Sequence, residues 1–240
     1  MPEMQEHFPA MALNGPASSG DQTQFDLRSA PDACRQPSSD TLTPKILEMF
    51  TIGYATKSVD VYIAQLLEHG VNVVADVRSV PYSKRFHEYH RESLIPHLQQ
   101  AGIRYVYLGE ELGPRSKDPQ HYDETGQVQF DRLMEASLYR AGEQRLFTGI
   151  GKGYSIALTC ACKDPAICHR SLLIGWSLLH RHGHELQHIR HGGALETQAE
   201  LEQRLLQETG TMVDMLAGAA EARQLAWKKQ CLARAYRKSE

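Results

Sequence analysis

Leu47–Val77, LEMFTIGYATKSVDVYIAQLLEHGVNVVADV, is the stretch that decides the fold. Its first part, residues 47–53, mixes apolar, β-branched and aromatic residues, as strands do. Ser58 then caps a predicted helix, which carries apolar residues on one face and ends at Gly70. Residues 71–77 form a short apolar run, which is typical of a strand buried in a parallel sheet. The stretch therefore predicts a strand–helix–strand unit.

The same alternation of helix and strand continues beyond this unit. The predicted elements are a helix over 91–101 that Pro96 limits or bends, a strand over 103–108, a helix over 130–141, a strand over 154–160, a helix from Pro165 to about His180 and a strand over 184–189. Such alternation predicts an α/β fold, a single domain with a mostly parallel sheet flanked by helices. Ligands of open sheets of this kind bind just beyond the carboxyl ends of the strands.

Two further segments flank the alternating region, which we place at residues 45–193. Residues 1–44 are rich in Pro, Ser, Gly, Asp and Gln, so they bury too little apolar area to offset the entropy of ordering. We expect them to form a flexible, disordered N-terminal tail. Residues 194–240 are expected to form a C-terminal helical extension, with helices over 195–207 and 212–237.

Composition limits the classes of function. The 240 residues carry a net charge of −3, so bulk charge does not indicate nucleic-acid binding. No apolar run approaches the roughly 20 residues that span a bilayer, and the N-terminus lacks the basic and apolar stretches of a secretory signal. Three of the five cysteines lie within residues 160–168, which does not resemble a disulfide framework. We therefore expect a cytoplasmic protein with no membrane partner.

Polar residues follow the ends of the first two predicted strands. Tyr54 comes directly after the first strand, and Asp76 and Arg78 share one face at the end of the second. A charge at the end of a buried strand must be paired or must bind something. One interpretation is that Arg78 binds an anionic or carbonyl group, that Asp76 orients it, and that Ser83 helps to cradle a phosphate. The other interpretation is a structural ion pair beside a solvated loop.

Thr159–Arg170, TCACKDPAICHR, follows the fourth predicted strand and carries several reactive side chains. Three cysteines and a histidine match the ligand count of a zinc site, although the spacing is C-x-C-x5-C-H rather than the familiar C-x2-C pairs. Cys168 and His169 would also point about 100° apart if both lay on the following helix, which makes joint ligation awkward. A structural zinc site is therefore one of three interpretations of this segment.

A reactive thiolate is the second interpretation. A cysteine near a helix N-terminus, beside His169 and Arg170, has its pKa lowered by the dipole and by positive charge, which prepares Cys168 or Cys162 as a nucleophile. The third interpretation is that the cysteines are small, buried and inert. Arg170 opposes the dipole at a helix start, so an anion should compensate it, either Asp164 or Asp76 of the chain or a ligand.

Three other stretches contribute less. Residues 109–127 form a long loop, and loops of this length inside a compact domain are often functional lids. The glycine-rich stretch 148–154 precedes a strand and lacks the Gly-Lys-Ser/Thr ending of a P-loop, so it does not predict a nucleotide cofactor. The cofactor therefore stays unknown. The histidines between His180 and His191 are spread over a helix end, a turn and a strand, and we interpret them as surface residues rather than metal ligands.

Several segments together resemble the family called domain of unknown function 488. The matching pieces, in the family's order, are residues 51–56 (TIGYAT), 76–83 (DVRSVPYS) with Phe86, 102–105 (GIRY), 108–113 (LGEELG), 160–170 (CACKDPAICHR) and 188–189 (HI). The resemblance implies a compact, cytoplasmic α/β domain over roughly residues 48–190, without a settled activity. It also implies that the family's signature positions are here Arg78, Ser83, Cys168, His169 and Arg170. A shorter branch of the family carries other residues at the cysteine run, so the resemblance implies no metal common to all members.

These observations leave three hypotheses. The leading one is an enzyme that acts on an anionic small molecule or a nucleotide, because unlike reactive groups converge on one strand-end cleft. Its ligand-binding residues would be Tyr54, Arg78, Ser83 and Arg170, and its catalytic residues Cys168 as nucleophile with His169 or Asp76 handling protons. The second is a non-catalytic nucleotide or nucleic-acid binding module that uses the same arginines with stacking aromatic side chains. The third is a structural zinc-binding domain.

Overall fold

The computed structural model describes residues 48–83, 85–212 and 218–238, so the predicted tail over 1–44 lies outside the described residues. Its six strands are β1 (Met49–Gly53), β2 (Val73–Asp76), β3 (Arg104–Tyr107), β4 (Ile156–Cys160), β5 (Leu186–Ile189) and β6 (Leu195–Thr197). They form one sheet in the order β3-β2-β4-β1-β5-β6. All neighbours are parallel except β6, which is antiparallel to β5. The predicted α/β class with a mostly parallel sheet is confirmed.

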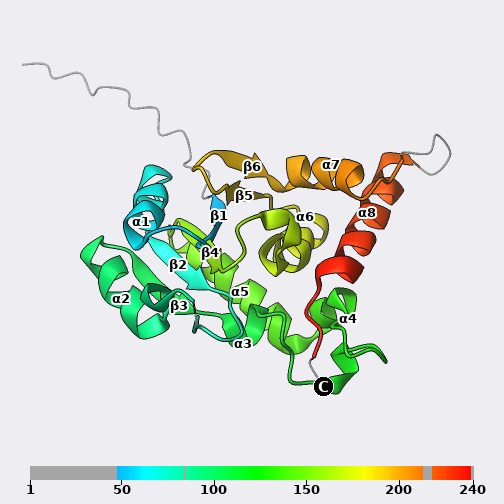
Figure 1. Ribbon diagram of the computed structural model, residues 1–240, viewed down its shortest axis with the longest axis horizontal. Coiled ribbons are helices and arrows are strands. Elements are labelled where there is room, and N and C mark those ends of the chain that lie inside the picture. The colour runs from blue at the N-terminus through cyan, green and yellow to red at the C-terminus, as the bar shows by residue number, and fades with distance from the viewer. Residues whose placement is uncertain (1–47, 84, 213–217, 239–240) are drawn as a thin grey trace, which may run out of the picture. The chain divides into compact units, whose positions relative to one another are not determined.

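Helices cover both faces of the sheet (Figure 1). One face packs against α1 (Val59–Glu68) and α2 (Arg91–Gln100). The other packs against the remaining larger helices, α4 (Phe130–Glu135), α5 (Ser137–Gly151), α6 (Trp176–His182), α7 (Gln198–Glu208) and α8 (Gly218–Arg234). Short helical turns complete the chain: η1 (His87–Tyr89), α3 (Gly109–Leu112), η2 (Pro119–His121), η3 (Pro165–Ile167) and the π-helix η4 (Arg170–Gly175).

Alternation along each strand sorts side chains between the two faces. In β2, Val73 and Ala75 belong to the core under α5 and α6, and Val74 belongs to the core under α1 and α2. Asp76 follows Val74 by two residues and therefore points toward α1 and α2. In β4, by the same rule, Cys160 shares the opposite face with Leu158. The two groups of candidate residues leave the sheet on different faces and meet only beyond the strand ends.

The order of the strands defines where a ligand should bind. The chain leaves β1 through α1 toward β2, on one side of β1, and leaves β4 through α6 toward β5, on the other side. Adjacent strands whose connections run in opposite directions form a switch point, with a crevice at their carboxyl ends. Here the crevice lies between Gly53 at the end of β1 and Cys160 at the end of β4, which are partners in the register.

The segment after β4 differs from the single helix predicted from Pro165 to about His180. Asp164 caps the short 3-10 helix η3 through its side chain, and Cys168 is then extended, with φ −124° and ψ 142°. A π-helix and α6 follow. Cys168 and His169 therefore do not lie together on a helix, and the argument from their 100° separation fails. The 3-10 turn was missed because Asp-Pro fits the start of either kind of helix.

Three other elements depart from prediction. The predicted helix over 130–141 is two helices, α4 and α5, separated at Ala136, where neither glycine nor proline marks the break. The predicted helix over 195–207 begins as strand β6, which pairs with β5, so the sheet continues past residue 193. The last helix spans Gly218–Arg234, and part of the predicted range, 213–217, lies outside the described residues. Within the described ranges, no helix is both long and apolar enough to cross a membrane.

Candidate functional site

A cavity of about 500 Å³ opens beyond the carboxyl ends of β1 and β4. It is lined by Tyr54, Arg78, Ser79, Val80, Tyr82, Pro114, Arg115, Phe130, Cys160, Ala161, Cys162, Ile167, His169, Leu172, Arg234 and Tyr236. Three arginines and a histidine thus face one space, and none of the described residues that line it is Asp or Glu. The charged side chains that line the cavity are therefore basic. Low-dielectric walls concentrate the electric field of such charges inside a cavity.

Arg78 enters this cavity already paired with Asp76. Its Nη2 lies 2.6 Å from Asp76 Oδ2, and its Nε donates to both oxygens of that carboxylate at 2.9 and 3.1 Å. Its Nη1 donates to the hydroxyl of Tyr54 and to the carbonyl of Tyr89. Burial lowers the pKa of Arg78, but the hydrogen bonds and charge of Asp76 outweigh burial and raise it overall. Most of the N–H groups of this guanidinium are therefore used inside the protein.

Tyr54 and Ser83 complete the network around Arg78. Tyr54 is buried and stacks on Tyr89 with ring centroids 4.2 Å apart, and burial raises its pKa. Ser83 accepts a hydrogen bond from the backbone N–H of Phe86 and orders the loop after β2. Of the predicted ligand-binding residues, Tyr54 and Arg78 line the cavity, whereas Ser83 does not line it and contributes to the loop.

Three thiols lie close together beyond the end of β4. Cys160 ends β4, Cys162 follows it, and Cys168 follows η3, yet the three sulfur atoms all lie within 4.8 Å of one another. Cys160 and Cys162 line the cavity. Cys168 is 1% exposed and does not. The structure therefore brings together the three cysteines of the segment and leaves the predicted nucleophile as the most buried of them.

The imidazole of His169 is fixed in one orientation by the backbone. Its Nε2 lies 2.9 Å from the carbonyl oxygen of Val77. A carbonyl only accepts, so Nε2 carries the proton that is donated. Its Nδ1 faces the sulfurs, 3.6 Å from Sγ of Cys160 and 3.8 Å from Sγ of Cys168. The basic nitrogen of this histidine is thus aimed at the thiols rather than at solvent.

The three cysteines of the cluster differ in how readily each becomes a thiolate. Hydrogen bonds from the thiols of Cys162 and Cys168, with the charge of His169, hold the pKa of Cys160 well below its usual range. The same neighbours raise the pKa of Cys162, because a second thiolate would lie against the first. Burial lowers the pKa of His169, but the Cys160 thiolate raises it more, so the net shift is well upward. The arrangement favours one thiolate on Cys160 beside an imidazolium.

Arg170 is fully buried and has little to bind within the chain. Its Nη1 donates to the carbonyl of Cys162 at 2.8 Å, and its Nε and Nη2 have no hydrogen-bond partner among the described residues. Gly53 admits this contact, because a Cβ there would lie 1.8 Å from the Cys162 oxygen. The aspartates that might compensate Arg170 are used elsewhere, since Asp76 pairs with Arg78 and Asp164 with Arg204. Arg170 does not line the cavity.

Residues that sequence reasoning did not identify supply the outer wall. Arg115 lies between α3 and η2, two helical turns that interrupt the long loop predicted over 109–127, and Arg234 and Tyr236 come from the end of α8 and the chain beyond it. Arg115 lies over the ring of Tyr236, 4.7 Å from its centroid. The length of the loop was a usable signal for Arg115. No local sequence pattern predicted Arg234. It reaches the cavity because α8 packs against η3 and η4.

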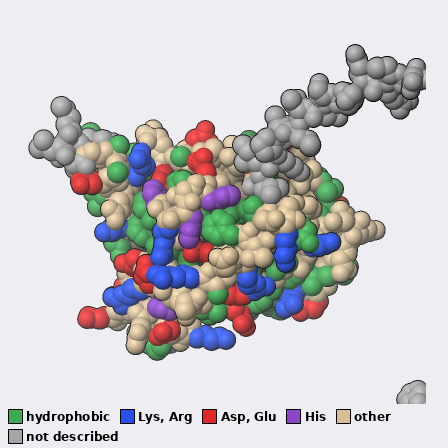
Figure 2. Space-filling view, turned by 180° about the vertical axis from the view of Figure 1, so that it is seen from behind, with side chains coloured by type: hydrophobic (Ala, Val, Ile, Leu, Met, Phe, Trp, Pro, Cys, Tyr) green, Lys and Arg blue, Asp and Glu red, His purple; other side chains and the backbone are tan. Residues whose placement is uncertain are grey.

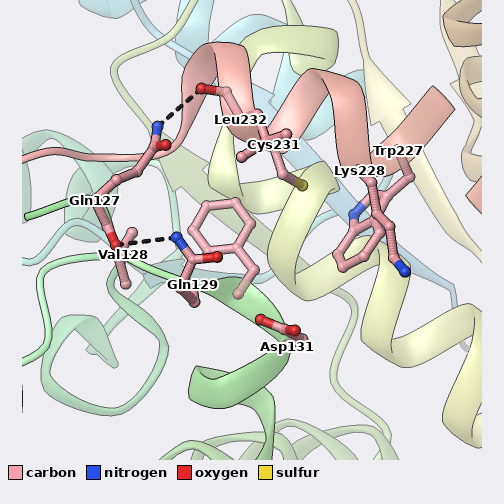
Figure 3. Close-up of a pocket in the computed structure, with 9 residues that line it drawn as sticks. Gln127, Val128, Gln129, Asp131, Trp227, Lys228, Cys231 and Leu232 are labelled. Atoms are coloured by element: carbon pink, nitrogen blue, oxygen red, sulfur yellow. Dashed lines mark hydrogen bonds between the residues drawn. The ribbon is translucent and has the colours of Figure 1, made fainter. Parts of the chain in front are cut away.

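Helix α8 is anchored beside this wall at a smaller cavity of about 160 Å³. Figure 3 shows Gln127 reaching the carbonyl oxygen of Leu232, with Cys231 and Trp227 on the same helix. A backbone bridge between Gln127 and Arg237 continues the contact beyond the helix. These contacts hold the C-terminal segment where Arg234 and Tyr236 can line the main cavity.

The face of the molecule drawn in Figure 2 carries mixed charge. On the face drawn in Figure 2, described basic and acidic side chains are interspersed, and histidine side chains gather beside an apolar area. A continuous basic band, which a long nucleic acid would require, does not cross the described part of this face.

Comparison with known proteins gives one match. The family model described as Domain of unknown function DUF488 matches residues 58–177, half of the chain. No curated protein and no solved structure matches. The matched range includes Arg78 and the segment Cys160–Arg170 but not Tyr54, Arg234 or Tyr236.

Proposed function

Because the chain belongs to the family Domain of unknown function DUF488, whose description gives no activity, we propose its function from the site: it is an enzyme that acts on an anionic small molecule or nucleotide in the strand-end cavity. The observation that carries the proposal is the convergence of three arginines and the thiol–imidazole cluster on one cavity without a carboxylate among its described lining residues. Unlike reactive groups gathered in one concave site are the general mark of an active site.

The anionic character of the substrate follows from which arginines are free to bind it. Arg78 is neutralised by Asp76, so it contributes mainly a fixed hydrogen-bonding wall. Arg115 and Arg234 are exposed at the cavity's outer side, and guanidinium groups bind phosphate and carboxylate through paired N–H donors. We assign these two arginines the anionic end of the substrate, with Arg78 and Tyr54 ordering the inner wall.

Aromatic side chains at the same rim favour a nucleotide or another flat anion. Tyr82 is 54% exposed and stacks on His90 with ring centroids 4.0 Å apart. Tyr236 also lines the cavity, with the guanidinium of Arg115 over its ring. Base–aromatic stacking contributes roughly 1–3 kcal/mol per base and tolerates different bases.

The reacting group of this enzyme is the cluster of Cys160, Cys162, Cys168 and His169 at the inner wall. Cys160 is the thiolate and lines the cavity, and His169 is the group that holds the proton. Cys168 and Arg170 do not line the cavity and would contribute by their effect on these two residues. Asp76 orients Arg78 rather than moving a proton, since its carboxylate is occupied by that guanidinium.

The test is ligand binding by calorimetry with pyrophosphate and adenosine monophosphate, followed by turnover of a panel of phosphate and carboxylate esters. We expect Arg115→Gln with Arg234→Gln to weaken binding by roughly tenfold or more. Arg140→Gln removes an exposed charge away from the cavity and is the control. Cys160→Ser should retain binding and lose turnover.

Two results would contradict the proposal. If the double variant and the Arg140→Gln control bind pyrophosphate equally well, the anion does not bind in this cavity. Binding by the unmodified chain with no turnover of any ester would favour the non-catalytic nucleotide-binding module instead.

A further inference from the structure

The thiol cluster has more sulfur than a nucleophile needs. Catalysis by a cysteine requires one thiol and one base. Here three sulfur atoms from two separate segments lie within 4.8 Å of one another, and an imidazole nitrogen faces two of them. Backbone geometry brings them together: the end of β4 supplies two, and the extended residue after η3 supplies the third.

Two nitrogen–sulfur distances in the cluster are close to those of a tetrahedral metal site. Zn–S bonds of about 2.3 Å and Zn–N bonds of about 2.1 Å at tetrahedral angles place sulfur and nitrogen about 3.6 Å apart. Nδ1 of His169 lies 3.6 Å from Sγ of Cys160 and 3.8 Å from Sγ of Cys168.

The orientation of His169 is the one that a metal ligand needs. Metal-binding histidines usually donate their other ring N–H to a carbonyl or carboxylate, which fixes the ring and the tautomer. His169 donates from Nε2 to the carbonyl of Val77, so Nδ1 points toward the thiols of Cys160 and Cys168 and would be free to bind a metal ion once it loses its proton. An inert core histidine would not require this nitrogen to face the thiols of Cys160 and Cys168.

A metal ion held by the three cysteines and His169 would also explain the buried charge of Arg170. Three thiolates around a divalent ion leave one net negative charge. Arg170 follows His169, donates to the backbone of Cys162, and has two nitrogen atoms without a hydrogen-bond partner among the described residues. A buried guanidinium requires nearby negative charge. Asp76 and Asp164 are paired with other arginines, so they do not meet that requirement.

We propose that Cys160, Cys162 and Cys168, with Nδ1 of His169 as the fourth ligand, bind one divalent metal ion of the zinc class. Soft thiolate ligands with one imidazole select such an ion over magnesium or calcium. The inference goes beyond the proposed function, because anions can bind Arg115 and Arg234 without a metal. It replaces one part of the proposed function: Cys160 and His169 would be metal ligands, so the ion and its thiolates, rather than a free Cys160 thiolate beside a protonated His169, would face the substrate.

The test is metal analysis of the full chain, purified under reducing conditions and reconstituted with zinc. We expect about one zinc per chain, and cobalt in its place should give the visible absorption of a tetrahedral thiolate site. Cys162→Ser should lower zinc affinity by at least roughly tenfold, whereas Cys231→Ser, a cysteine outside the cluster, should retain it. His169→Gln keeps a donor for the carbonyl of Val77 and should change the cobalt spectrum.

Several outcomes would overturn the inference. Reconstituted protein without zinc, or Cys162→Ser and Cys231→Ser proteins that hold zinc equally, would exclude the site. If Cys162→Ser does not fold, an unchanged cobalt spectrum in His169→Gln still excludes His169 as a ligand. Pyrophosphate binding that persists in zinc-free wild-type protein, with no zinc taken up, would end the metal proposal and leave the proposed function standing. Zinc uptake without pyrophosphate binding would support the metal proposal and contradict the proposed function.

Discussion

His188 is a single residue whose burial couples the fold to pH. It is 0% exposed, with Nδ1 2.8 Å from Oγ1 of Thr51 and Nε2 2.9 Å from Oε1 of Gln198. A neutral ring satisfies both contacts, because Nε2 donates to the amide oxygen and Nδ1 accepts from the hydroxyl. Burial, together with the charges of Arg170 and Arg204 and against that of Cys168, lowers the pKa of His188 to about 3. The expectation that this histidine lies on the surface was wrong.

The sign of the pH effect follows from these two protonation states. The unfolded chain protonates His188 below about pH 6.5, and the folded chain does so only near pH 3, so stability is lost as pH falls through that window. At pH 5 the loss from this residue is about 2 kcal/mol relative to neutral pH. Urea unfolding at pH 5 and 7 should show a smaller pH dependence in His188→Gln than in wild type. His97→Gln, at an exposed position, should keep the wild-type dependence, and equal slopes in all three would refute the assignment.

Residue patterns predicted only part of the site. The two-residue period of a strand correctly placed Asp76 and Arg78 on one face, and they form an ion pair. Cys160 and Cys162 are likewise two residues apart where β4 ends, and their sulfur atoms lie within 4.8 Å of each other. The position of Cys168 could not be predicted, because it depends on the 3-10 turn capped by Asp164 and on the extended residue that follows. Local propensity does not distinguish that turn from the start of an α-helix.

Among the elements, helix α8 supports the segment that carries the thiols. Nε2 of Gln230 donates to the carbonyl of Ala166 in η3 at 2.7 Å. Nε1 of Trp227 donates to the carbonyl of Leu172 in η4 at 2.6 Å, and its ring stacks on Trp176 with centroids 4.6 Å apart. The sequence predicted this helix but not its partner, because its sparse apolar positions, such as Ala222 and Ala226, do not specify which surface they cover.

Loss of one of these contacts should loosen the site segment. Gln230→Ala leaves a buried carbonyl without its donor, which costs about 1–3 kcal/mol. We expect lower stability in urea and faster alkylation of the cluster thiols by iodoacetamide in the presence of a chelator. Gln224→Ala changes the same residue type at an exposed position of α8 and serves as the control. Alkylation at the same rate in both variants would show that α8 does not hold this segment.

For the whole molecule, net charge and site charge have opposite signs. The chain carries −3, which repels an anion at long range, while the cavity presents Arg115 and Arg234 at its exposed side. Exposed charges are screened by salt, because the Debye length falls from about 30 Å at 0.01 M to about 10 Å at 0.1 M ionic strength. Attraction that arises at two solvent-facing arginines should therefore weaken with salt, although the protein as a whole is acidic.

We expect the affinity for pyrophosphate to fall by roughly tenfold between low and physiological salt, as two exposed ion pairs of up to about 1 kcal/mol each would give. The measurement is calorimetry at several salt concentrations. Arg115→Gln with Arg234→Gln should flatten the dependence, whereas Arg140→Gln should leave it unchanged, since Arg140 pairs with Glu135 away from the cavity. An affinity that is independent of salt in the unmodified chain would place the anion deeper in the cavity, against the buried guanidinium group of Arg78, where screening is weak.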